Sequence, residues 1–119
     1  MMAATGPDTS GDTGPDSGPD TSPLEDIDKV VHEPARLMIL AQLYVVEEAD
    51  FTFVQNRTGL TAGNLSFHTT KLEGAGYLET EKRFRDRMPS TLLRLTPEGR
   101  AAFKEYRERL SRVFETLPE

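Results

Sequence analysis

The segment from Thr61 to Ala75 carries the side chains best suited to chemistry in this chain. At helical spacing, one side gathers small polar residues with one aromatic and one basic residue: Gly63, Ser66, Phe67, Thr70 and Lys71, with Asn64 at the border. The other side holds Leu65, Thr69 and Leu72, with His68 at its edge, and is expected to face a core. Amides and hydroxyls beside an apolar ring predict recognition of a partner rather than catalysis.

The partner that these groups suit is the edge of the base pairs in duplex DNA. Asparagine can pair bidentately with adenine, serine and threonine can pair with several bases, and an apolar group can contact the methyl group of thymine. A glycine in the first turn lets the backbone approach a phosphate, which the free amide groups of a helix start favour. We therefore expect the DNA-binding residues of this segment to be Thr61, Gly63, Asn64, Ser66, Phe67, Thr70 and Lys71.

Phe67 stands out on this polar side, because an exposed aromatic ring is costly unless something covers it. Three interpretations stay open from the sequence. The ring packs within its own subunit, or touches a thymine methyl group or a sugar, or binds a protein partner.

A second group of candidate residues is the run of cations Lys82, Arg83, Arg85 and Arg87. Cations at this position would neutralise backbone phosphates or enter the minor groove, and each contact would release counterions, so affinity should fall with salt. Residues 51–97 hold seven basic and four acidic residues, although the whole chain has a net charge of −6. The alternative is a solvated strand face, since Glu79 and Glu81 partly balance the charge. Arg57 is a weaker phosphate candidate.

Residues for catalysis or metal binding are sparse. The chain has two histidines and no cysteine, which excludes disulfides and thiolate metal sites. It also lacks a P-loop, an HExxH motif and a nucleophile with a recognisable base. We expect no enzyme activity, no cofactor and no metal, and we expect His68 to be hydrogen-bonded within the fold.

The elements that must position these residues can be predicted from their capping signals. Thr52 to Gln55 is typical of a capping box that begins a helix, which Gly59 would end in a left-handed conformation. Leu60 follows as a buried residue. Thr61 would cap a helix from Ala62 to about Ala75, closed by Gly76. Two short helices around a tight glycine turn indicate a helix-turn-helix.

The rest of the chain predicts a β-hairpin and a last helix. Residues 77–85 and 90–96 are rich in β-formers and are joined by a turn over residues 86–89. Thr96-Pro97-Glu98 begins a helix with an N-cap and a proline at the first position. Together with a helix over residues 35–48, this order predicts a mainly α fold with a small hairpin (α+β), a winged helix-turn-helix.

Apolar residues on the two long helices predict a homodimer. Residues 35–48 are apolar on more than one side, and the last helix has a narrow seam like that of a coiled coil. The expected interface residues are Leu37, Tyr44, Phe103, Tyr106, Leu110, Val113 and Leu117. Because one helix and one wing read too few base pairs to select a genomic site, two recognition helices about 34 Å apart would read a pseudopalindromic operator.

The N-terminus differs from the remaining chain. Residues 1–28 hold seven acidic residues and no Lys or Arg, which leaves 14 basic and 13 acidic residues in positions 29–119. Residues 1–22 lack large apolar side chains beyond the initial methionines, which predicts disorder, so the folded domain is expected over residues 23–117. A helix is expected from Ser22 to Val31. No apolar run is long enough to cross a membrane, and we expect a cytoplasmic protein.

Residues 30–110 resemble the winged-helix regulators of the ArsR and MarR type, most closely a subgroup described as winged-helix DNA-binding domain. The resemblance lies in four stretches, residues 32–40 (HEPARLMIL), 59–66 (GLTAGNLS), 71–78 (KLEGAGYL) and 94–100 (RLTPEGR). It implies a repressor-like transcriptional regulator that binds double-stranded DNA. The chain departs from the family at its wing turn, which lacks the usual glycine, and in the missing cysteine motif of metal-sensing members.

Two alternatives remain. A winged helix can also serve as a protein-interaction module without sequence-specific DNA binding, because fold alone does not decide function. The acidic N-terminal segment could shield the basic surface or recruit transcription machinery. The sequence names no small-molecule effector.

Overall fold

A computed structural model describes residues 27–118 of the chain. Residues 28–107 form one compact unit, and residue 27 belongs with residues 108–118 to a second. The predicted disordered segment, residues 1–22, lies outside the described residues. Of the predicted helix over residues 22–31, the described part is a turn. The carboxylate of Asp28 accepts the amide of Val30 at 2.9 Å, a local bond that competes with helix formation.

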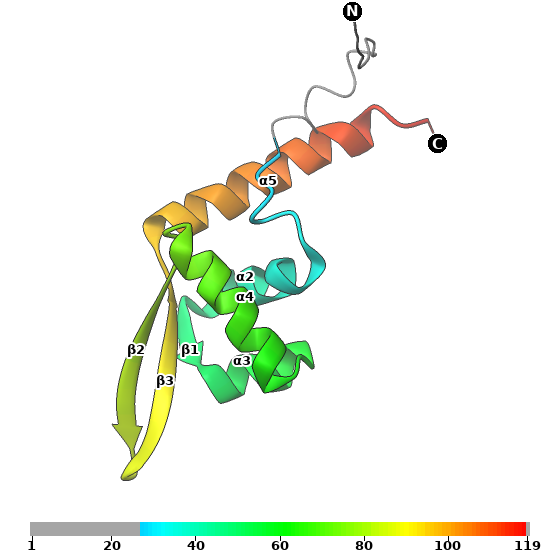
Figure 1. The fold of residues 1–119 in the computed structure, drawn as a ribbon. Coiled ribbons are helices and arrows are strands. Elements are labelled where there is room, and N and C mark those ends of the chain that lie inside the picture. Colours follow the sequence, from blue (N-terminus) through cyan, green and yellow to red (C-terminus); the bar gives the residue numbers. More distant parts are fainter. Residues whose placement is uncertain (1–26, 119) are drawn as a thin grey trace, which may run out of the picture. The chain divides into compact units, whose positions relative to one another are not determined.

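The first three described helices, α2, α3 and α4, begin and end at local signals (Figure 1). Helix α2, Pro34–Val46, is capped by Glu33, which accepts the amide of Arg36 at 2.8 Å. Helix α3, Phe51–Thr58, ends at Gly59 with φ 76°, as predicted. Helix α4, Ala62–Gly74, is capped by Thr61 through the amide of Asn64 at 3.1 Å, also as predicted.

The predicted capping box at Thr52 is wrong, because α3 already begins at Phe51 and Thr52 lies inside it. Asp50 precedes the helix and makes no side-chain capping bond. Its carboxylate is paired elsewhere, with Arg85. Leu60 is half-buried rather than fully buried.

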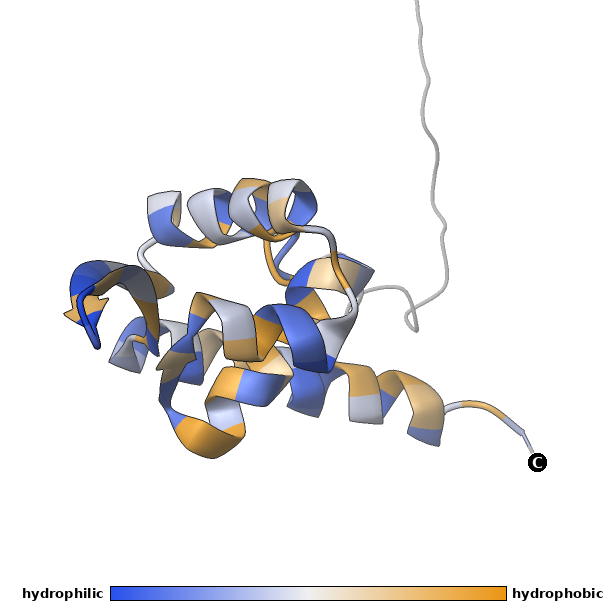
Figure 2. Cartoon of the chain, turned by 90° about the horizontal axis from the view of Figure 1, so that it is seen from below, coloured by the Kyte–Doolittle hydropathy of each residue, from blue (hydrophilic) through white to orange (hydrophobic). Residues whose placement is uncertain are grey.

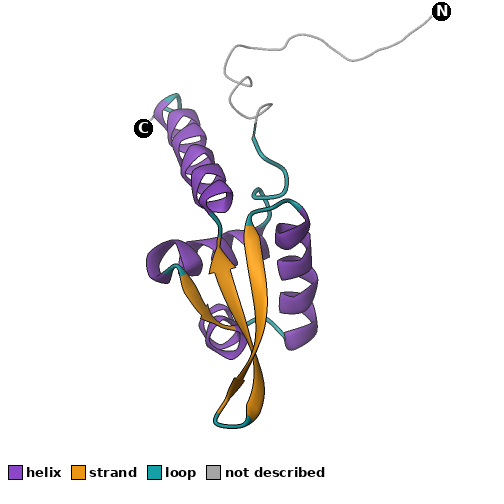
Figure 3. Cartoon of the chain, turned by 90° about the vertical axis from the view of Figure 1, so that its left-hand side faces the viewer, coloured by secondary structure: helices purple, strands orange, loops and turns teal. Residues whose placement is uncertain are grey.

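The sheet has three antiparallel strands in the order β1-β3-β2, with β1 at Glu48–Asp50, β2 at Leu78–Arg85 and β3 at Met88–Leu95 (Figures 1 and 3). The predicted four-residue turn is too long, since Met88 and Pro89 belong to β3. The turn consists of Asp86 and Arg87, with φ of 52° and 69°. Positive φ at both positions matches the two-residue turns that join twisted strands.

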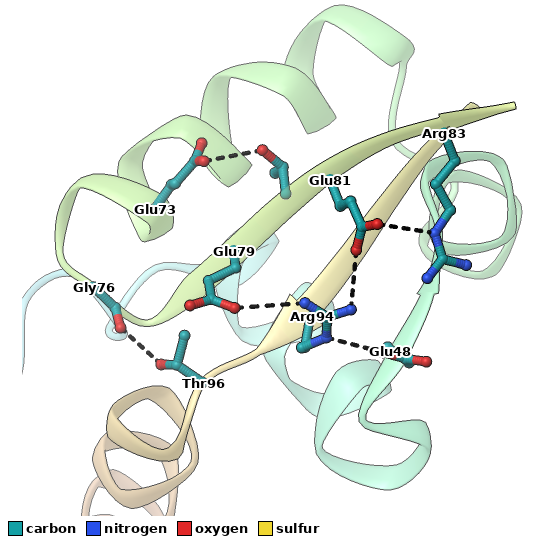
Figure 4. Close-up of polar contacts among 9 residues, drawn as sticks. Glu48, Glu73, Gly76, Glu79, Glu81, Arg83, Arg94 and Thr96 are labelled. Atoms are coloured by element: carbon teal, nitrogen blue, oxygen red, sulfur yellow. Dashed lines mark hydrogen bonds and ion pairs between the residues drawn. The ribbon is translucent and has the colours of Figure 1, made fainter. Parts of the chain in front are cut away.

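Helix α5, Pro97–Glu115, begins where the three-stranded sheet ends. The hydroxyl of Thr96 accepts the amide of Gly99 at 2.9 Å and donates to the carbonyl of Gly76 at 2.7 Å (Figure 4). One side chain thus caps α5 and holds Gly76, which lies in the connection between α4 and β2. The predicted N-cap is confirmed.

The core of the larger unit is formed by inward-facing residues of its helices and of strands β2 and β3. Figure 2 shows the described helices with alternating hydrophobic and hydrophilic segments, as expected for helices with one buried face. The fully buried side chains are Val31, Ile39, Leu40, Leu43, Val54, Leu65, Leu72, Leu78 and Leu93. Within the described residues, four helices and a small sheet confirm the predicted winged helix.

Tyr77 links the start of the hairpin to the turn before α2. Its hydroxyl donates to the carboxylate of Asp28, and this bond, with burial, raises the pKa of Tyr77 to about 12. The bond requires a protonated phenol. Its contribution to stability is therefore complete below the ordinary tyrosine pKa of about 10 and is lost as the pH rises through 12.

Tyr77→Phe should lower the free energy of unfolding by about 1 to 2 kcal/mol at pH 7, a value reduced for partial exposure. The difference between wild type and variant should shrink as the pH rises from 10 to 12. Urea unfolding at pH 7 and at pH 11.5 measures this. A difference that stays constant with pH would contradict the assignment.

Candidate nucleic-acid interface

The two sides of α4 are separated as the sequence predicts. Leu65, Thr69 and Leu72 are buried against the core of the larger unit. The opposite side is exposed along its length. The exposed residues are Thr61, Gly63, Asn64, Ser66, Phe67, Thr70 and Lys71. All seven predicted DNA-contacting residues of this segment thus lie on one accessible surface, the polar face of α4.

Two ring contacts position Phe67, whose side chain is 55% exposed. Its ring meets the His68 ring edge-on, with centroids 5.1 Å apart, and the ammonium group of Lys71 lies 5.4 Å from its centroid. His68 is held in turn, because Arg36 donates to its Nδ1 at 3.1 Å. The predicted hydrogen bond of His68 within the fold is confirmed.

The wing, defined here as residues 78–95, carries the four predicted cations. They differ in whether a carboxylate or a hydroxyl already binds them. Arg85 pairs with Asp50 at the start of α3. Arg83 pairs with Glu81 at 3.5 Å, and the ammonium group of Lys82 donates to Thr91 at 3.3 Å. Arg87 lies exposed at the turn. A phosphate would therefore meet Lys82 and Arg87 at little cost, but would compete with carboxylates for Arg83 and Arg85.

Arg94 forms an ion-pair cluster that the sequence did not reveal (Figure 4). Its guanidinium lies 2.9 Å from Glu48, 3.2 Å from Glu81 and 3.6 Å from Glu79. Hydrogen bonds to Glu48 and Glu81 raise the pKa of Arg94, and the bond from Arg94 lowers the pKa of Glu81. One cation thus joins β1, β3 and β2 and offsets acidic residues that would repel phosphates. The register Glu48↔Arg94↔Glu79 across the sheet brings these charges together.

The predicted interface residues separate into two groups. Tyr106 is only 5% exposed, because its hydroxyl bonds His32 at 2.9 Å, and burial raises its pKa. Its side chain is therefore packed within its own subunit, and its place at a homodimer interface stays a prediction. Tyr44 and Phe103 pack on each other with centroids 5.3 Å apart, and Leu37 is half-buried.

The second group lies near the end of α5. Leu110 and Val113 are half-buried, and Leu117 is 59% exposed. The neighbouring Phe114, which was not among the predicted interface residues, is 61% exposed. It lies one residue beyond Val113 and therefore outside the expected seam.

A groove of about 570 Å³ lies beside the half of the wing nearer its turn, next to β1 and α3. Apolar side chains and the Asp50–Arg85 pair line it, and the hydroxyl of Ser90 is buried there with no hydrogen-bond partner in the described part of the chain. The lining residues are Val46, Glu48, Ala49, Asp50, Phe53, Arg83, Phe84, Arg85, Ser90 and Leu92.

Residues 27–118 contain no group of three or more His, Asp or Glu side chains that could hold a metal ion. No helix in this range is both long and apolar enough to cross a membrane.

An exposed polar recognition helix, preceded by a short helix and followed by a basic hairpin, defines a winged helix-turn-helix. A family model described as winged helix DNA-binding domain matches residues 35–114. The chain therefore belongs to the winged helix DNA-binding domain family, and the resemblance seen in the sequence is confirmed.

Two relatives extend this result. An uncharacterized protein from Methanocaldococcus jannaschii is 38% identical over 78 residues, which is 66% of this chain and 85% of that protein. The transcriptional regulator homologue protein from Pyrococcus horikoshii OT3 superposes with a TM-score of 0.76 at 32% identity, over 82% of this chain and 98% of the other. The second of these matches supports a DNA-binding regulator.

A more distant structure shows the fold alone. The PcaV transcriptional regulator from Streptomyces coelicolor, solved with its natural ligand, superposes with a TM-score of 0.62 at 22% identity, over 77% of this chain and 64% of the other.

Proposed function

We propose that this chain is a repressor-like transcriptional regulator that reads a pseudopalindromic operator as a homodimer in the cytoplasm. The observation that carries the proposal is the polar face of α4, which is exposed along its length while the opposite side is buried. A helix presented in this way fits the major groove. A bound dimer would block access to the duplex that it covers.

In this proposal, residues in the middle of the polar face contact the bases. Asn64 would pair with adenine, and Ser66 and Thr70 would bond base edges on the same side. Thr61 and Gly63 lie at the start of α4, where backbone amides and the helix dipole favour a phosphate. The space beside Gly63 is open, with nothing within 4 Å of the position that a Cβ would take.

The wing would supply contacts that do not depend on sequence. Lys82 and Arg87 would neutralise phosphates directly, and Arg83 and Arg85 would join by exchanging a carboxylate for a phosphate. The dimer would bring two copies of α4 to successive major grooves about 34 Å apart. Exposed apolar residues near the end of α5, Phe114 and Leu117, support that association.

Asp50→Asn should raise affinity for all duplexes up to about fivefold per subunit, which corresponds to one exposed ion pair of about 1 kcal/mol. The variant releases Arg85 of each subunit for a phosphate, so the salt dependence should steepen by about one contact per subunit. Helix α3 should be unaffected, because Asp50 makes no capping bond. Fluorescence anisotropy on two unrelated duplexes measures the effect.

Asp86→Asn is the matched control for this prediction. It also removes one negative charge from the same surface, but it frees no arginine. Equal gains from both variants would show that Arg85 is not held back by Asp50.

A mobility-shift titration at 50 and 200 mM salt tests the proposed function against the protein-interaction alternative. With about six phosphate contacts per dimer, affinity should fall about a thousandfold between the two conditions. Affinity that is absent or insensitive to salt would favour the alternative. Sedimentation of the free protein should give the mass of two chains.

A further inference from the structure

We propose that Phe67 forms a binding site for the C5 methyl group of a pyrimidine, so that each half-site contains one methyl-bearing position. The inference rests on the proposed function and assigns a chemical group to one residue of the same surface. Phe67 lies on the polar face of α4, one turn after Gly63 and one turn before Lys71, and more than half of its side chain is exposed.

The ring of Phe67 is held in place rather than free. Its edge-on contact with His68 and the Lys71 ammonium group over its face restrict it. The His68 side chain is 14% exposed and is fixed by Arg36 of α2. An apolar group that is ordered before binding loses little rotamer freedom on binding, which favours its use as a contact.

The chemistry of the DNA major groove determines which group can contact this ring. Among the four bases, the major groove presents hydrogen-bond donors and acceptors and one apolar group, the thymine methyl. A phenyl ring against a donor or acceptor would remove that group from water without replacing its bond, which is costly. The neighbours Asn64, Ser66 and Thr70 can all hydrogen-bond, so Phe67 is the member of the face that requires an apolar counterpart.

The same methyl group is present in 5-methylcytosine, so two DNA sources share this chemistry. The test starts from a duplex that the full chain selects from a random pool. Each thymine is then replaced singly by deoxyuridine, which lacks only the methyl group. At the position so found, the pair is also changed to C·G, with and without methylation of the cytosine.

At one thymine position per half-site, replacement by deoxyuridine should lower the affinity of the wild type about fourfold. This factor corresponds to the burial of one methyl-sized group. Methylation of the cytosine at that position should raise the affinity about fourfold over that of the unmethylated C·G duplex. Phe67→Ala should bind the thymine and deoxyuridine duplexes equally. Phe84→Ala truncates an exposed aromatic ring on the wing. This variant should keep the wild-type ratio of affinities for the thymine and deoxyuridine duplexes.

Three results would overturn the inference. They are affinity unchanged by deoxyuridine at every thymine, a thymine preference that persists in Phe67→Ala, and a ratio lost equally in Phe84→Ala. In each of these the chain still selects DNA, so the proposed function stands. If the chain selects no duplex at all, the inference and the proposed function fail together.

Discussion

Gly99→Ala should lower the free energy of unfolding by about 3 kcal/mol, the largest effect expected from a glycine-to-alanine change within residues 27–118. A Cβ at residue 99 would lie 2.1 Å from the carbonyl oxygen of Tyr77 and 2.9 Å from a methyl group of Leu95. The carbonyl belongs to the backbone and also accepts the amide of Thr96 at 3.2 Å, so it cannot move aside freely. Forced overpacking of this kind costs about 1 to 3 kcal/mol, occasionally more.

Gly74→Ala provides the control for this prediction. Residue 74 also lies in a helix, and nothing lies within 4 Å of the position that its Cβ would take. Because alanine favours helices over glycine, the variant should gain up to about 1 kcal/mol. Urea denaturation of both variants measures the contrast. A Gly99→Ala protein as stable as wild type would show that α5 and the start of the hairpin are not in close contact.

Asn64→Ala should weaken binding to the selected operator about 10- to 100-fold and relax the preference at one base pair. The fold should be unaffected, because the bond that caps α4 uses the backbone amide of Asn64 and the hydroxyl of Thr61. Binding to the operator and to a scrambled duplex of equal length, measured by anisotropy, separates lost specificity from lost affinity.

Arg87→Ala is the comparison for this variant. Its guanidinium lies on the exposed turn of the wing and would meet phosphates. It should weaken operator and scrambled duplexes alike and reduce the salt slope by about one per subunit. If Asn64→Ala also weakened both duplexes equally, the assignment of Asn64 to a base would be wrong.

Local signals in the sequence are sufficient to predict much of this structure. Thr61 and Thr96 cap their helices, and Gly59 ends α3 in the left-handed conformation, because each outcome depends on residues within one turn. The buried and exposed sides of α4 follow from its helical periodicity. The polar face can therefore be predicted from the amino-acid sequence alone.

Features that depend on distant residues could not be predicted in the same way. Strand β1 has three residues, which is too short to show a periodic pattern, and it exists because β3 pairs with it. The Asp50–Arg85 and Arg94 pairs depend on strand register. The spacing of Tyr106 fits an apolar seam, but its hydroxyl forms a hydrogen bond with His32 within the same unit.

The central claim is that the polar face of α4 enters the major groove of specific DNA. Selection from a pool of random duplexes by the full-length chain tests it most directly. The structure predicts enrichment of one short sequence that occurs twice, inverted about a dyad, with centres about 10 base pairs apart, and loss of that enrichment with Asn64→Ala. A pool that remains random after repeated selection would contradict the claim.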